Sequence, residues 1–124
     1  MGDWEHVPAG RYGKEAIAAL GLWELHRSKF IPAKDARAAL GMLAGGACPV
    51  NLGYANLANL VSGVEVLTEI SDEFHTPIMY LTGHVTESEH EAVDEFSEFL
   101  MTPAVASTFR AHGFLPPFNK PEQL

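Results

Sequence analysis

Residues 7–16 read Val-Pro-Ala-Gly-Arg-Tyr-Gly-Lys-Glu-Ala, and this stretch predicts the start of a helix. Pro8 suits a first helical turn because proline has a fixed φ and no N–H. Ala9 and Gly10 carry so little side chain that another group can approach the backbone closely. The first N–H groups of a helix have no partner within it and lie at the positive end of its dipole, so they can bind an anion. An ordinary helix start is the commoner meaning of so short a motif, and an anion-binding turn is the alternative.

The composition is that of one globular domain. A chain of 124 residues with 47% apolar content can form a hydrophobic core. Its 8 basic and 16 acidic residues give a formal net charge of −8, and no basic cluster stands out, so we expect no nucleic-acid partner. Glycine, proline or charge interrupts every apolar window before the roughly 18 residues that a membrane span needs. We therefore expect no membrane insertion.

The N-terminal residues and the cysteine content bear on location. Residues 1–6 are acidic and lack an apolar run, unlike a signal peptide. We therefore expect a cytoplasmic chain if this sequence is complete, or else a part of a longer protein. Cys48 is the single cysteine, so no internal disulfide and no paired-cysteine metal motif can form. Its expected role is that of a small core residue.

Helical and strand-like patterns alternate over the first two thirds of the chain. Apolar spacing and turn residues predict helices at 8–20, 22–26, 34–43 and 55–60, and strands at 29–31, 48–54, 64–70 and 77–85. This alternation predicts an α/β fold with a mixed or parallel sheet. A capping box at 88–91 and Pro103 predict two further helices, the second ending at Gly113. Residues 114–124 are expected to form an irregular tail.

Catalytic and metal-binding patterns are weak. No two histidines are three or four residues apart on a predicted helix, as a helical metal site needs; they are His6, His26, His75, His84, His90 and His112. The acidic run from Glu87 to Glu98 fits a solvated helix face better than an acid–base pair. No serine has the Gly-x-Ser-x-Gly context of a nucleophile, and no phosphate loop or dinucleotide fingerprint occurs. We predict no catalytic residue, no metal ligand and no enzymatic activity.

Several short motifs follow one another in a defined order. They are Asp3 to Ala16, Leu20 to Trp23, Asp35 to Leu40, Tyr54 to Ala58, His75 to Tyr80, Phe99 to Pro103 and Phe109 to Phe114. Each motif is weak by itself, but their common order over nearly the whole chain is hard to obtain by chance. In this order the chain resembles the second half of the molybdate-binding subunit of ABC transporters.

The resemblance implies a single domain, 1–124, with the α/β architecture of one lobe of a type II periplasmic binding protein: a mixed sheet flanked by helices. In that family, backbone N–H groups and a tyrosine hydroxyl hold molybdate or tungstate between two lobes. By matching motif positions, Ala9 and Ala36 would give N–H groups and Tyr54 its hydroxyl. No cofactor is implied besides this oxyanion ligand. From the residues alone, packing is the favoured explanation for both Ala36 and Tyr54.

The chain also departs from the family pattern. The first lobe, which supplies the other half of the ligand shell, is absent from this sequence. Trp4 follows Asp3 where the family usually has proline. In the tyrosine motif the family usually has an aspartate two residues before the alanine, whereas this chain has Leu57 before Ala58. The C-terminal helices would pack on the first lobe, so their large apolar side chains need another surface; they are Phe96, Phe99, Leu100, Phe109 and Phe114. Exposing each one forfeits about 1.5–3 kcal/mol, so we expect these helices to repack on the chain's own sheet or to be exchanged in a swapped dimer.

Two functions of different classes follow. The first is an oxyanion-binding module related to the substrate-binding subunit of a molybdate ABC transporter. Its implied partners are a small oxyanion, an ABC transporter permease, and either a second copy or a separate missing lobe, and its implied location is periplasmic. The alternative is an interaction or oligomerisation domain that has lost ligand binding.

Overall fold

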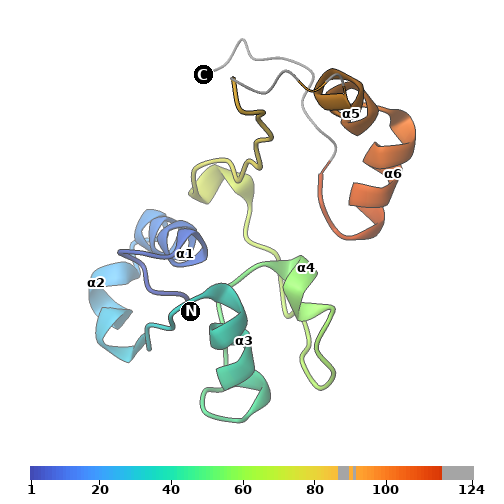
Figure 1. Cartoon of the computed structure of the whole chain (residues 1–124). Helices are drawn as coiled ribbons and strands as arrows, with labels where there is room; N and C mark the ends of the chain where they lie inside the picture. The colour runs from blue at the N-terminus through green and yellow to red at the C-terminus, as the bar shows by residue number, and fades with distance from the viewer. Residues whose placement is uncertain (87–89, 91, 116–124) are drawn as a thin grey trace. The chain divides into compact units, whose positions relative to one another are not determined.

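A computed structural model describes residues 1–86, 90 and 92–115 (Figure 1). The chain divides into two compact units, Met1–Ile78 and Met79–Leu124, which are described separately below. The predicted capping box, apart from His90, and the predicted tail beyond Leu115 lie outside the described residues. The single domain expected for 1–124 stays a prediction.

Helices account for the regular structure of the first unit. They are α1 Pro8–Ala19, α2 Trp23–His26, η1 Arg27–Lys29, α3 Ala36–Ala44, α4 Ala55–Ala58 and η2 Asp72–Phe74. The predicted helices near 8–20, 22–26 and 34–43 are confirmed, and the one predicted at 55–60 is shorter. Pro8 stands in the first turn of α1, and Gly21, with φ of 72°, follows its end as predicted. No helix within the described ranges has both the length and the apolarity to cross a bilayer.

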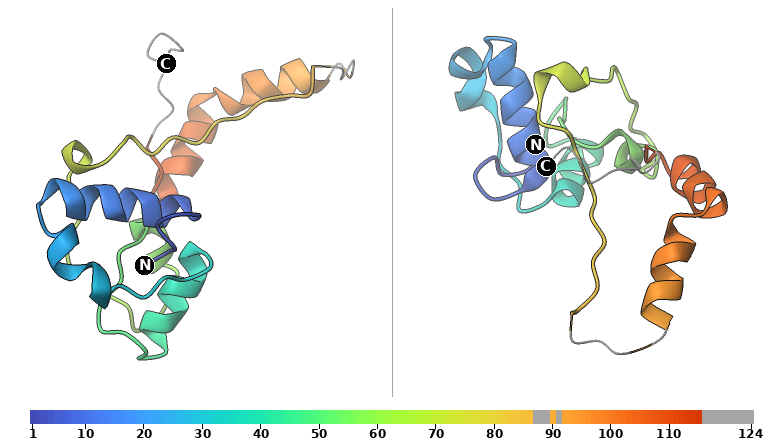
Figure 2. Two further views of the ribbon diagram at one scale, coloured as in Figure 1. Left: turned by 90° about the vertical axis from the view of Figure 1, so that its left-hand side faces the viewer. Right: turned by 90° about the horizontal axis from the view of Figure 1, so that it is seen from above.

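The four strand predictions are wrong for the described residues. Lys29 ends a 3₁₀ turn, and the other three segments form neither strand nor helix; Figure 2 shows 77–85 as a thin extended trace. Within the described part, β-pairing is limited to one isolated parallel bridge between Gly2 and Ala33. A strand requires a paired neighbour for its backbone groups, and an apolar, β-branched segment without one stays irregular. The mixed sheet is therefore not confirmed.

The core of the first unit is made largely of small side chains. The buried apolar residues are Met1, Ala9, Ala16, Ala33, Ala39 and Leu40. Met1 lies against Gly13 of α1, and its amino group donates to the Ile31 carbonyl at 3.4 Å. Burial lowers the pKa of this amino group. Small residues let α1 lie directly against the N-terminal segment.

Helix α1 is also tied to the last part of its unit. The Glu15 carboxylate accepts a hydrogen bond of 2.7 Å from the backbone N–H of Thr76. The neighbouring His75 ring lies 6.0 Å from the ring of Tyr12, and its Nε2 is 3.8 Å from the Asp72 carboxylate. The contacts of Glu15 and Tyr12, together with the packing of η2 on α1, hold this segment against α1.

We predict that Glu15→Ala frees the Thr76 amide. A hydrogen bond to a charged acceptor contributes about 1.5–3 kcal/mol, so exchange of the Thr76 amide should accelerate about tenfold or more. Hydrogen exchange followed by NMR measures this rate directly. Glu24→Ala is the matched control, because the Glu24 carboxylate is exposed and pairs only with Arg27 among the described residues. Equal Thr76 exchange in the two variants would contradict the assigned hydrogen bond.

The second unit contains α5 Ala92–Leu100 and α6 Pro103–Ala111. The Thr102 hydroxyl donates to the Phe99 carbonyl at 2.8 Å and accepts from the N–H of Val105 at 3.5 Å, so it links the end of α5 to the start of α6. Phe114 lies edge-on to both Phe109 and Tyr80. Even so, Phe96 and Phe99 remain 59% and 53% exposed. Repacking or exchange of these helices stays a prediction.

Candidate functional site

The starts of α1 and α3 follow two paired segments of the first unit. The Asp3 N–H donates to the Ala33 carbonyl at 2.8 Å, and the Ala33 N–H donates to the Met1 carbonyl at 3.0 Å. The pairing is parallel, and Figure 1 shows the N-terminus beside the start of α3. Both helices therefore begin beyond the carboxyl ends of parallel segments. In open α/β folds, ligands bind beyond the carboxyl ends of parallel strands, and the two helix starts have the same relation to this single bridge.

Ala9 lies in the first turn of α1 and is only 5% exposed. The Val7 carbonyl accepts from the N–H groups of Gly10 and Arg11, at 2.9 and 3.0 Å. Among the described residues nothing accepts from the N–H of Ala9. This donor has the geometry of an orphan group at a helix start.

Ala36 is the first residue of α3 and is half-buried. The preceding Asp35 caps the helix: its carboxylate accepts from the Ala38 N–H at 2.7 Å, and its carbonyl accepts from the Ala39 N–H at 3.1 Å. No acceptor for the N–H of Ala36 occurs in the described ranges. The cap therefore orders the helix start and leaves the N–H of Ala36 available.

Tyr54 is the N-cap residue of α4 and is half-buried. Its carbonyl accepts from the N–H groups of Leu57 and Ala58, at 3.1 and 3.3 Å. Helix α4 packs on α3. The structure thus places all three predicted site residues at helix starts of the first unit. The bridge between Gly2 and Ala33 joins the segments that lead to Ala9 and Ala36. Helix α4, which Tyr54 precedes, packs on α3, the helix that begins at Ala36.

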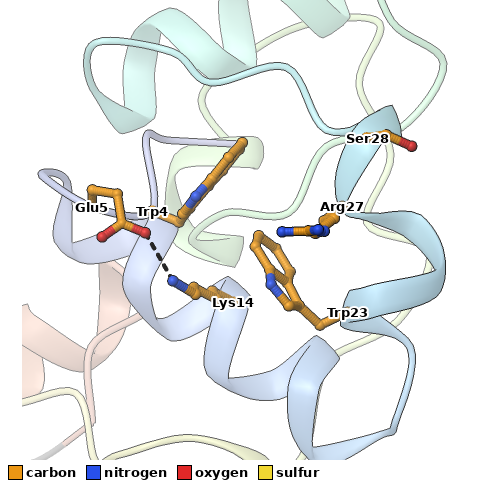
Figure 3. A pocket seen from close by; sticks show the side chains of 6 residues that line it. All are labelled: Trp4, Glu5, Lys14, Trp23, Arg27 and Ser28. Carbon is orange, nitrogen blue, oxygen red and sulfur yellow. Dashed lines mark hydrogen bonds and ion pairs between the residues drawn. The ribbon is translucent and has the colours of Figure 1, made fainter.

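A separate groove of about 430 Å³ lies between the N-terminal loop, α1 and α2 (Figure 3). We call it the aromatic groove; its lining residues are Trp4, Glu5, Lys14, Trp23, Arg27 and Ser28. The rings of Trp4 and Trp23 meet edge to face with centroids 5.3 Å apart. Phe30 stacks on Trp23 at 5.6 Å. The three rings form one aromatic cluster.

Two cations border this cluster. The Lys14 ammonium is 2.8 Å from the Glu5 carboxylate and 5.4 Å from the centroid of the Trp23 ring, a distance at which a cation–π attraction operates. Arg27 lies beside Trp23 (Figure 3). The Arg27 guanidinium is also 3.3 Å from the Glu24 carboxylate. The groove therefore combines an apolar floor with a charged rim.

Comparison with known proteins decides the family. Residues 1–115 match the family described as bacterial extracellular solute-binding protein. The chain belongs to this solute-binding protein family. It is 34% identical over 114 residues to the molybdate-binding protein ModA of Escherichia coli strain K12. The match covers 92% of this chain and 44% of that protein. It is 27% identical over 114 residues to ModA of Haemophilus influenzae, with 92% and 45% covered.

A solved structure that is similar to this chain supports the same family assignment. A substrate-binding domain from Clostridium difficile, assigned to a molybdenum ABC transporter, superposes with a TM-score of 0.82 at 26% identity. The match covers 94% of this chain and 52% of that one. The chain has the fold of part of a substrate-binding domain and spans less than half the length of its curated solute-binding relatives. The resemblance to the molybdate-binding subunit is confirmed.

Sequence reasoning did not find the aromatic groove of this solute-binding chain. Trp4 stood out as a departure from the family pattern and Trp23 as part of a motif, but nothing in their spacing indicated contact. A signal was available, because the chain's two tryptophans flank a predicted helix that is followed by Gly21. A turn at Gly21 brings α2 back onto α1, and the rings then meet.

Proposed function

We propose that the chain is part of an oxyanion-binding module that takes molybdate or tungstate without catalysing a reaction. The observation that carries the proposal is a pair of N–H groups, at Ala9 and Ala36, for which the described residues provide no acceptor, on helices that start beyond the same parallel bridge. Neutral donors at helix starts bind dianions through local contacts. The net charge of −8 opposes this little, because charges beyond about 10 Å are screened. The names of the relatives support molybdate as the ligand.

In this proposal Ala9 and Ala36 donate N–H groups, and Tyr54 donates its hydroxyl, to one tetrahedral oxyanion. The other half of the shell comes from a further lobe, since the relatives are more than twice as long as the matched part. That lobe also provides the strand partners that complete a mixed sheet. The ligand needs no cofactor.

The setting follows from the same family. We propose a periplasmic location, which the description of the family as extracellular supports. We also propose that the chain delivers the oxyanion to an ABC transporter permease, because the solved relative is assigned to such a transporter. A second copy or a separate missing lobe would be the further partner. The alternative function, an interaction domain without ligand, is favoured by the exposed phenylalanines of α5.

Calorimetric titration with molybdate, tungstate and sulfate tests the proposal. We expect molybdate and tungstate to bind and sulfate to bind more weakly. At a hundred times Kd, a ligand stabilises the folded state by about 2.7 kcal/mol, which raises Tm measurably. No heat and no change in Tm with either metal oxyanion would favour the alternative function.

We predict that Tyr54→Phe weakens molybdate binding about tenfold, because the variant lacks the hydroxyl that donates to the charged ligand. Titration of wild type and variant under the same conditions measures the ratio. Tyr80→Phe, in the second unit, is the matched control and should bind like wild type. Equal affinities of Tyr54→Phe and wild type would remove Tyr54 from the site.

A further inference from the structure

The two helix starts of the proposed oxyanion site differ in charge. Helix α1 follows Val7, whose side chain makes no capping hydrogen bond, and the first turn of α1 contains no acidic residue. Helix α3 follows Asp35, whose carboxylate accepts a hydrogen bond from the N–H of Ala38 at 2.7 Å. The start of α3 therefore carries a negative charge that the first turn of α1 lacks.

The carboxylate of Asp35 lies close to the proposed donor of Ala36. Asp35 is the residue immediately before Ala36, and the capping hydrogen bond holds its side chain over the first turn of α3. An anion held by the N–H of Ala36 would thus lie well within the roughly 10 Å beyond which exposed charges are screened. The repulsion between this anion and the carboxylate is therefore felt in full, unlike that of the more distant acidic residues.

Two basic residues flank Asp35 in the sequence, but neither neutralises it by contact. Lys34 and Arg37 are both exposed. In the part of the chain that the structure describes, the Asp35 carboxylate forms no ion pair with either of them or with another cation. Its charge therefore acts on a ligand at the start of α3.

We propose that Asp35 determines how the site distinguishes oxyanions by their charge. The inference rests on the proposed function and adds to it a selectivity-determining residue, which is not itself a donor. Because Coulomb repulsion is proportional to the charge of the ligand, the carboxylate weakens the binding of a dianion more than that of a monoanion. The N–H groups of Ala9 and Ala36 and the Tyr54 hydroxyl supply the attraction, and Asp35 limits the affinity for divalent oxyanions.

Asp35 has an effect of opposite sign on the helix itself. Aspartate, asparagine and serine cap helices comparably well, but only aspartate adds a negative charge that the positive end of the helix dipole favours. Replacing the carboxylate by a neutral cap should therefore lower Tm slightly and raise the affinity for a dianion. A residue with a purely structural role would not combine a loss of stability with a gain in affinity.

Calorimetric titration of wild type and Asp35→Asn with molybdate and with perrhenate tests the role of this charge. Both probes are tetrahedral oxyanions of similar size, but molybdate carries two negative charges and perrhenate carries one. We expect Asp35→Asn to bind molybdate about tenfold more tightly and perrhenate about threefold more tightly, because halving the ligand charge halves the repulsion energy. Both gains should shrink at about 1 M salt, where the screening length falls to about 3 Å.

Two further variants attribute the effect to the charge of Asp35. Asp35→Ser keeps a neutral cap without an amide and should show the same dependence on ligand charge. Glu69→Gln is the matched control, because it removes an exposed carboxylate outside the helices of the first unit, and it should bind both ions like wild type. If wild type binds molybdate but Asp35→Asn binds it no more tightly, or gains as much for perrhenate, the role of Asp35 is overturned and the proposed function stands. If neither wild type nor any variant binds either ion, both are overturned.

Discussion

Ala36→Pro is expected to weaken molybdate binding by about ten- to a hundredfold and to leave the fold intact. The substitution removes one N–H from the proposed ligand shell, and a hydrogen bond to a charged group contributes about 1.5–3 kcal/mol. Ala36 is the first residue of α3, the helical position at which proline is favoured. Asp35 before it is extended, with φ of −160° and ψ of 173°, as a residue that precedes proline requires.

Titration with molybdate, together with thermal unfolding, separates binding from stability. Ala36→Gly is the matched control, since it removes the side chain but keeps the N–H, and it should bind like wild type. Unchanged affinity in Ala36→Pro, with a normal unfolding curve, would exclude the Ala36 N–H as a ligand donor.

Gly10→Ala is expected to destabilise the first unit by about 1–3 kcal/mol, the usual range for overpacking. A Cβ at Gly10 would collide with the carbonyl oxygens of Gly2 and Asp3, and backbone atoms cannot turn aside as a flexible side chain can. Relief of the collision requires α1 to move away from the segment that pairs with Ala33. Urea denaturation monitored by tryptophan fluorescence measures the loss.

Gly41→Ala provides the contrasting control for this prediction. Gly41 lies within α3 and is exposed, and an added Cβ meets no atom within 4 Å. Alanine at such a position stabilises a helix by roughly 0.5–1 kcal/mol over glycine. If Gly10→Ala raised stability as Gly41→Ala does, the close approach of α1 to residues 2–3 would be wrong.

The helices could be predicted from the sequence because their signals are local. Pro8 marks the first turn of α1, Gly21 follows its end, and the pair Thr102-Pro103 marks the start of α6. The strands could not, because pairing depends on a neighbour that need not be close in sequence. The apolar segment 64–70 has strand-like composition and still forms no strand in the structure.

The candidate site also has parts that the local sequence indicates and parts that it does not. The open N–H of Ala9 follows from residues next to it, so the pattern around Pro8 indicated it directly. The roles given to Ala36 and Tyr54 depended on the family resemblance, and ligand binding at all three residues stays a prediction. The aromatic groove depends on contact between Trp4 and Trp23, which the sequence separates by a whole helix.

The hydrogen bond between Glu15 and Thr76 has a practical consequence for dissecting the chain. A truncation that stops before residue 72 removes η2 and the partner of the Glu15 carboxylate, so α1 loses its support on that side. Fragments designed for crystallisation or isotope labelling should therefore extend at least to Ile78.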